Sequence, residues 1–153
     1  MKRFIDLLRA AVISPEVIAL LVPFAVNFYW PEPAVFFAEQ CAKDIKWAFG
    51  ASAISIPFVA AAYQIGGEII SPHGARRLLL DWPDYPMLKC RVVLALTFCV
   101  LGLALGIAGA FAIGSYKSEF GANLIFSGLL ASATSLGTVA LAKWKARELL
   151  REG

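Results

Sequence analysis

Charged residues are scarce in this chain. They make up 16% of its 153 residues, against about 25% in an average soluble domain. Four long stretches hold no Asp, Glu, Lys or Arg: 17–31, 47–67, 92–116 and 120–142. The longest segment between them, 68–91, has 24 residues, whereas a soluble domain needs at least about 50. The sequence therefore excludes a separate soluble catalytic or nucleic-acid-binding domain.

Residues that bind metals are also few. His73 is the only histidine, and the three cysteines, Cys41, Cys90 and Cys99, form no C-x-x-C pair. Protein zinc sites need three or four such ligands, usually at short and regular spacing. We therefore expect no metal and no cofactor, and we expect the cysteines to be free thiols.

Residues that could support nucleophilic catalysis are equally few. Ser71, His73 and Asp81 or Asp84 fall in one loop, but groupings of this kind are common by chance, and nucleophilic catalysis needs them within reach of one another. No Gly-Lys-Ser or Gly-Lys-Thr phosphate-binding loop occurs. The sequence predicts no catalytic residues and no enzyme.

The chain instead contains several long stretches without a charged residue. About 20 apolar residues in a helix cross a hydrocarbon core of about 30 Å. The stretches 47–67, 92–116 and 120–142 meet that length, and within lipid they must be helical to satisfy their own backbone. We expect three transmembrane helices there.

A fourth span is predicted over 15–31, although its uncharged run has only 15 residues. Ser14-Pro15-Glu16 is typical of a helix start, with Ser as N-cap, Pro at the first position and Glu in the first turn. Pro31-Glu32-Pro33 ends the helix, and Pro23 is expected to kink it. Trp and Tyr residues avoid the span centres, as residues at a lipid–water boundary do: Tyr29, Trp30, Trp47, Tyr63, Trp82, Tyr85, Tyr116 and Trp144.

The orientation follows from Lys and Arg, which accumulate on the cytoplasmic side of membrane proteins. With both termini on one side, that side holds eleven of these residues and the other side three. We therefore place both termini and the loop 68–91 in the cytoplasm. The three on the outer side are Lys43, Lys46 and Lys117.

The segments outside the spans are short. Residues 1–13 have apolar residues at helical spacing and basic residues opposite, which predicts an interfacial helix. Residues 34–46 are helical in composition and are expected to run into the second span. Residues 143–153 are expected to continue the last span as a basic cytoplasmic helix.

The loop 68–91 combines arginines with aromatic residues: Arg76, Arg77, Trp82 and Tyr85. Two interpretations stay open. One is an interfacial loop that sets the entry angle of the next span. The other is a docking surface for a cytosolic protein, because Arg and aromatic side chains are good binding anchors.

Small and polar residues form stripes along two spans. Asn123, Ser127, Thr134 and Thr138 share one face of 120–142, and Gly102 and Gly106 form a G-x-x-x-G pair in 92–116. Such faces let helices approach closely and hydrogen-bond. They predict either packing inside one bundle, or a face that contacts a neighbouring subunit or lines a water-filled pore in an oligomer.

Glu16 is the one candidate acid inside the membrane, where ionisable residues are expensive and usually functional. The string Glu16-Val17-Ile18 in the first of four predicted helices resembles the small multidrug resistance exporters. In that family, a glutamate of the first helix exchanges drug for protons. The resemblance covers three residues and the span count. The family is shorter and has tight loops, whereas this chain has a 24-residue inner loop.

Together these features predict an all-α integral protein of the inner or plasma membrane, with four transmembrane helices and short interfacial helices. The expected partners are the lipid bilayer, further copies of the chain and a cytosolic protein, with no nucleic acid. The favoured function is a non-enzymatic subunit that self-associates and docks a cytosolic partner. The alternative is an oligomeric pore or membrane-permeabilising effector, for example in phage defence or lysis. A proton-coupled exporter is the remaining hypothesis.

Overall fold

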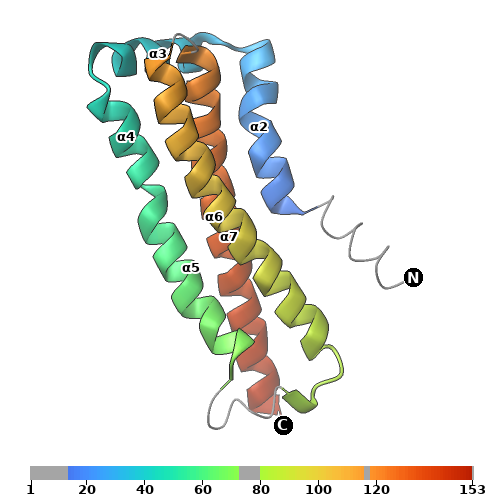
Figure 1. Cartoon of the computed structure of the whole chain (residues 1–153). Helices are drawn as coiled ribbons and strands as arrows, with labels where there is room; N and C mark the ends of the chain where they lie inside the picture. Colours follow the sequence, from blue (N-terminus) through green and yellow to red (C-terminus); the bar gives the residue numbers. More distant parts are fainter. Residues whose placement is uncertain (1–13, 73–79, 116–117, 153) are drawn as a thin grey trace.

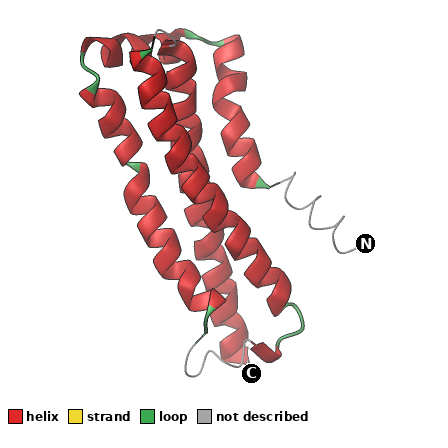
Figure 2. Cartoon of the chain, in the orientation of Figure 1, coloured by secondary structure: helices red, strands yellow, loops and turns green. Residues whose placement is uncertain are grey.

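The computed structural model describes residues 14–72, 80–115 and 118–152. Its helices, labelled in Figure 1, are α2 (Pro15–Tyr29), α3 (Glu32–Lys43), α4 (Lys46–Ala53), α5 (Ser55–Ile70), α6 (Tyr85–Gly114) and α7 (Ser118–Glu152). The described residues contain no strand (Figure 2), so the expected all-α fold is confirmed. The interfacial helix predicted over 1–13 lies outside the described residues.

Three helical segments are long and apolar enough to cross a membrane. They are α4 with α5 over Lys46–Ile70, α6 over Tyr85–Gly114, and α7 over Ser118–Glu148. Their lengths are 25, 30 and 31 residues, or about 37 to 46 Å at helical rise, which exceeds a hydrocarbon core of about 30 Å. The fourth predicted span differs, because α2 and α3 are bent by 99° at the break between them.

The helices form an elongated bundle. Figure 1 shows α6 and α7 along the centre, α4 and α5 along one side, α2 on the other side and α3 across one end. We call the end that carries α3 the α3 end, and the opposite end, where α7 finishes, the tail end. α2 packs on α7, touches α6 little, and begins partway along the bundle (Figure 1).

The start and end of α2 follow from its sequence. Ser14 is extended, and its hydroxyl accepts a hydrogen bond from the Val17 N–H at 3.3 Å. Pro15 occupies the first helical position, where its missing N–H costs nothing. The helix ends at Tyr29, just before Pro31. The predicted N-cap and helix end are both confirmed.

α3 does not continue into α4, so the expected uninterrupted helix from 34–46 into the second span is wrong. Asp44 is extended, with φ −144° and ψ 104°. Its Oδ1 accepts a hydrogen bond from the Lys46 N–H at 3.0 Å. An Asp side chain that binds the backbone two residues further on competes with helical hydrogen bonding, which explains the break.

The segment formed by α4 and α5 is interrupted at Ile54, whose N–H bonds the Ala51 carbonyl in a tight turn at 3.2 Å. The cause is Pro57, because it has no N–H for the carbonyl four residues earlier and its ring clashes there. Ser52 lies beside this break, and its hydroxyl is 2.7 Å from the Gly106 carbonyl of α6. The interrupted helix thus remains attached to the centre of the bundle.

At the tail end, the connection between α5 and α6 is shorter than the loop predicted over 68–91. α5 runs to Ile70 and α6 begins at Tyr85, which leaves a shorter connection. Tyr85 is 7% exposed, and its hydroxyl lies 2.9 Å from the Ile69 carbonyl and 3.2 Å from the Ile70 carbonyl. Tyr85 therefore ties the start of α6 to the end of α5.

α6 and α7 approach so closely that their backbones meet at glycines. A Cβ on Gly102 would lie 2.6 Å from the carbonyl oxygen of Gly128, and a Cβ on Gly109 would lie 2.5 Å from that of Gly121. Real Cβ atoms do not approach this closely. The contact therefore depends on glycine in both helices, as in close helix pairs of membranes.

We predict that Gly128→Ala destabilises the protein by about 1–3 kcal/mol, because the added methyl overpacks the contact between α6 and α7. The matched control is Gly137→Ala on the same helix, where a Cβ meets nothing within 4 Å. That change should be neutral or stabilise by up to about 1 kcal/mol. Reversible unfolding in mixed micelles measures both. Equal effects would contradict the glycine contact.

Candidate functional site

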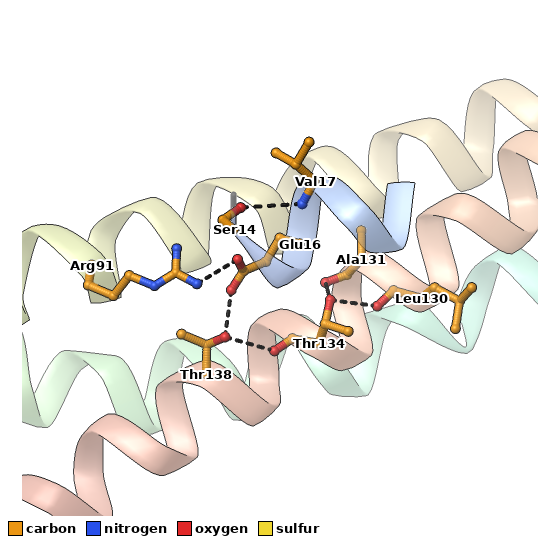
Figure 3. Close-up of polar contacts among 8 residues, drawn as sticks. All are labelled: Ser14, Glu16, Val17, Arg91, Leu130, Ala131, Thr134 and Thr138. Carbon is orange, nitrogen blue, oxygen red and sulfur yellow. Dashed lines mark hydrogen bonds and ion pairs between the residues drawn. The ribbon is translucent and has the colours of Figure 1, made fainter. Parts of the chain in front are cut away.

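Glu16 is the most unusual side chain of the described residues, because it is charged and 0% exposed. Its Oε2 accepts a hydrogen bond from Arg91 Nη2 of α6 at 2.7 Å. Its Oε1 accepts one from the hydroxyl of Thr138 on α7 at 2.5 Å. Figure 3 shows Glu16 between these two partners. One carboxylate therefore joins three helices.

The local sequence explains how Glu16 reaches this place. Ser14 and Pro15 start α2 immediately before it, so Glu16 lies in the first turn. A helical side chain leans toward the N-terminus of its helix, and here that direction leads to the tail end. Arg91 and Thr138 lie in that direction on the two central helices. Glu16 thus extends the reach of a helix that begins partway along the bundle.

The cluster lies near one boundary of the uncharged stretches. Arg91 is the last charged residue before 92–116, and Thr138 lies five residues before Lys143, which is about 7 Å along the helix. Lys143 itself pairs with Glu68 at 2.9 Å. Of the four charged side chains in these two ion pairs, that of Glu16 is the least exposed.

The energetics of the pair give it a positioning role. Removing two charges from water costs several kcal/mol per ion, so a buried pair is weak evidence for stability, but breaking one partner is strongly destabilising. Arg91 adds to the cost, because its Nη1 is buried and has no partner among the described residues. The pair therefore specifies where α2 docks more than it adds to the stability.

The polar stripe of α7 faces α2. The Ser127 hydroxyl donates to the Leu20 carbonyl at 2.8 Å, and Thr138 binds Glu16. Thr134 bonds within its own helix, 2.8 Å from the Leu130 carbonyl, and Asn123 is buried and bonds the Glu119 carbonyl. The structure thus bonds two of these sequence-selected residues, Ser127 and Thr138, to α2.

The glycine pair of α6 is also engaged inside the chain. Gly102 and Gly106 are both buried. Gly102 meets Gly128 of α7, and Gly106 meets Ser52 of α4. Of the two interpretations of the stripes, packing inside one bundle is the one that this geometry favours.

Of the four candidate docking residues at the tail end, the structure describes two, Trp82 and Tyr85. Arg76 and Arg77 lie outside the described residues. Trp82 is partly buried and packs with Leu88 against Tyr85 and Ala146. Tyr85 is buried, so its hydroxyl holds the fold and is not presented to a partner.

No group of three or more His, Cys, Asp or Glu in the described ranges is placed to hold a metal ion. The cysteines Cys41, Cys90 and Cys99 are free thiols. Cys99 packs against α7, with its Sγ 3.7 Å from the Ser132 carbonyl.

The role of Arg91 is the main feature that the sequence did not indicate. By sequence it counts only as one of eleven inner-side cations. Arg91 directly precedes an uncharged run, and the predicted topology places it on the same side as the acidic start of the first predicted helix. These two features were a usable signal for an ion pair with Glu16. The pairing itself spans 75 residues, so only the folded arrangement identifies it.

Comparison with protein-family models, curated proteins and solved structures finds no match to this chain.

We predict that Glu16→Gln destabilises the protein by about 3 kcal/mol, because it leaves the partly buried guanidinium of Arg91 without its counter-ion. The double variant Glu16→Leu with Arg91→Leu should recover much of this loss. Glu148→Gln is the control, since Glu148 pairs with Lys145 on an exposed surface and should cost less than about 0.5 kcal/mol. Unfolding in mixed micelles measures these variants together with the single changes Glu16→Leu and Arg91→Leu. A double variant as unstable as the sum of its single changes would contradict a coupled pair.

Proposed function

We propose that this chain is a non-enzymatic, multi-pass membrane protein whose tail end docks a cytosolic protein at the inner face of the cell membrane. Three long apolar helices suggest a membrane-embedded protein. The excess of Lys and Arg toward the tail end supports a cytoplasmic location for that end. The feature that carries the docking proposal is the braced, basic extension of α7.

The four-pass arrangement is supported by the Glu16 cluster. α2 has 15 residues, about 22 Å at helical rise, and is short for a hydrocarbon core of about 30 Å. Its Trp30 lies beside α3 at one end, and at the other end Glu16 bonds Arg91 at the boundary of 92–116. The two long side chains cover the distance that the short helix leaves, as snorkelling side chains do.

α7 extends beyond what a membrane requires. Its 35 residues give about 52 Å, so roughly 20 Å lie outside a hydrocarbon core of about 30 Å. The extension is braced at its base, where Ala146 packs on Tyr85 and Lys143 pairs with Glu68. A rigid helix of this kind binds a partner with a low entropic cost.

The surface of this extension is basic. On α7, Lys145 is 57% exposed and Arg147 is exposed, and Lys89 near the start of α6 is exposed as well. The sequence adds Arg76 and Arg77 to the same side. Such a surface complements an acidic protein surface, and complementary charge gives specificity and a fast encounter. The proposed partner is therefore a cytosolic protein with an acidic face.

The alternatives receive less support from the geometry. A pore lined by the α7 stripe needs that stripe to face water, and Ser127 and Thr138 bind α2 instead. An exporter needs a carboxylate that exchanges protons with a ligand, and Glu16 is 0% exposed and paired. Self-association through Gly102 and Gly106 needs faces that already pack inside the chain.

The topology is tested with single cysteines in a chain whose own cysteines are replaced by serine. Glu39→Cys on α3 should react with a membrane-impermeant maleimide from outside intact cells. Arg147→Cys on α7 should react only after the cells are opened. Reaction of Arg147→Cys in intact cells would contradict a cytoplasmic tail end.

Docking is tested by placing a photo-crosslinking amino acid at Lys89 or Arg147 in cells of the source organism. We expect one cytosolic protein to be captured from both positions, and the same position-specific adduct to be lost in Lys145→Glu. A crosslinker at Gln40 on α3 is the control and should not capture that protein. Equal capture from all three positions, or none from Lys89 and Arg147, would contradict the proposal.

A further inference from the structure

In the four-pass arrangement, the lipid-facing surface of the bundle is shorter on one side than on the other. α2 has 15 residues, or about 22 Å at helical rise. Figure 1 shows α4 and α5 along the opposite side of the two central helices. Their uncharged run, 47–67, has 21 residues, or about 30 Å. The apolar lengths of the two sides therefore differ by about 8 Å.

The exposed face of α2 is apolar and has a defined limit at each end. Tyr29 and Trp30 end it at the α3 end, and such residues collect where lipid meets water. Glu16, in the first turn, limits the helix at its other end. The side chains between these limits are aliphatic and 40–62% exposed: Ile18, Leu21, Val22 and Val26. The face thus matches a hydrocarbon layer that is thinner than about 30 Å.

Contacts at both ends fix the position of α2 along the bundle. At its start, Glu16 is bonded to Arg91 of α6 and Thr138 of α7. At its other end, a two-residue link joins it to α3, where Ala38 packs in one cluster with Ala122 of α7. α2 therefore does not slide along α7 to a depth that suits the bilayer better.

A membrane helix that is too short is matched by thinning of the bilayer, by snorkelling of its flanking side chains, or by oligomerisation. Tilting does not help, because it reduces the thickness that a helix spans. Snorkelling is already committed, since Glu16 reaches Arg91 inside the chain and the Trp30 indole donates to Glu32 at 3.1 Å. The remaining difference in length falls on the lipid that covers the face.

We propose that the exposed face of α2 selects phospholipids with short acyl chains from the surrounding bilayer. A short-chain lipid removes the mismatch beside α2, whereas beside α5 the same lipid would create one, because hydrophobic mismatch costs free energy in either direction. The hydrocarbon layer is then thinner along one side of the bundle than along the other. The inference rests on the four-pass arrangement proposed above, but not on the docking of a cytosolic protein.

The test uses the full chain in bilayers that contain equal amounts of dimyristoleoyl and dioleoyl phosphatidylcholine. The four native tryptophans are changed to phenylalanine, and one new tryptophan is introduced by Leu21→Trp on α2 or, as the control, by Ile56→Trp on α5. These positions are 62% and 55% exposed and lie near the middle of their segments. Brominating one lipid at a time makes fluorescence quenching a measure of contact with that lipid.

We expect the ratio of short-chain to long-chain contact to be about threefold higher in the Leu21→Trp chain than in the Ile56→Trp chain, because mismatch is present on the α2 side alone. The comparison between the two positions cancels the difference in depth between the bromine atoms of the two lipids. Thermal unfolding establishes that each chain is folded.

A second variant removes the charged limit of α2. In the double variant Glu16→Leu with Arg91→Leu, the uncharged surface extends toward the tail end, and a thicker hydrocarbon layer can cover it. The short-chain preference in the Leu21→Trp chain should then fall toward the value in the Ile56→Trp chain. Glu148→Gln is the control, because its ion pair lies on an exposed surface, and it should leave the preference unchanged.

Three results overturn the proposal. Equal lipid ratios at the two positions show that α2 selects no lipid. An unchanged preference in the double variant removes the charged start of α2 as its cause. Absence of quenching by either brominated lipid in the Leu21→Trp chain shows that another copy or another segment of the chain covers α2.

These outcomes are separate from those of the docking proposal. No cytosolic protein is present in the bilayers, so a failure of docking leaves the lipid ratios intact. A chain that does not insert into bilayers overturns both the lipid selection and the membrane assignment.

Discussion

The ion pair between Glu16 and Arg91 is the interaction on which the arrangement of the described residues depends most. The long helices define their own positions through length, apolar surface and glycine contacts. α2 has none of these advantages, because it is short and packs mainly on α7. Its position follows from a carboxylate that is bonded to α6 and α7 at once. Since α2 also covers the polar stripe of α7, the same pair decides whether that stripe is internal or free.

Much of the fold could be predicted from where charge is missing. The stretches 47–67 and 120–142 lie within long helical segments, and 92–116 coincides with α6 as far as Gly114. They could be predicted because the length of an uncharged run is a property of one segment alone. The N-cap at Ser14 was equally visible, since capping is local. The break at Asp44 was missed because a side-chain bond to the Lys46 backbone competes with a helix-forming composition.

The site was less accessible to prediction, because its residues meet across long separations. Glu16 stood out as an acid and Thr138 as part of a stripe, but neither pattern names a partner 122 residues away. Gly102 signalled a close approach without identifying Gly128. Tyr85 was predicted at a surface loop and is buried, since its hydroxyl finds two carbonyls at the end of α5. In each case the sequence pattern indicated the kind of contact, and only the folded structure identified the partner residue.

Tyr85 also has a consequence for the order of assembly during synthesis. The α5 carbonyls that it binds lie 15 and 16 residues earlier, so the hairpin of α5 and α6 can close soon after α6 begins to leave the ribosome. α2 is made before either, but its acid waits for Arg91 and then for Thr138, near the end of the chain. Among the described helices, α2 is therefore the first to be translated and the last to reach its final place. Until then, the carboxylate of Glu16 has neither of these two partners.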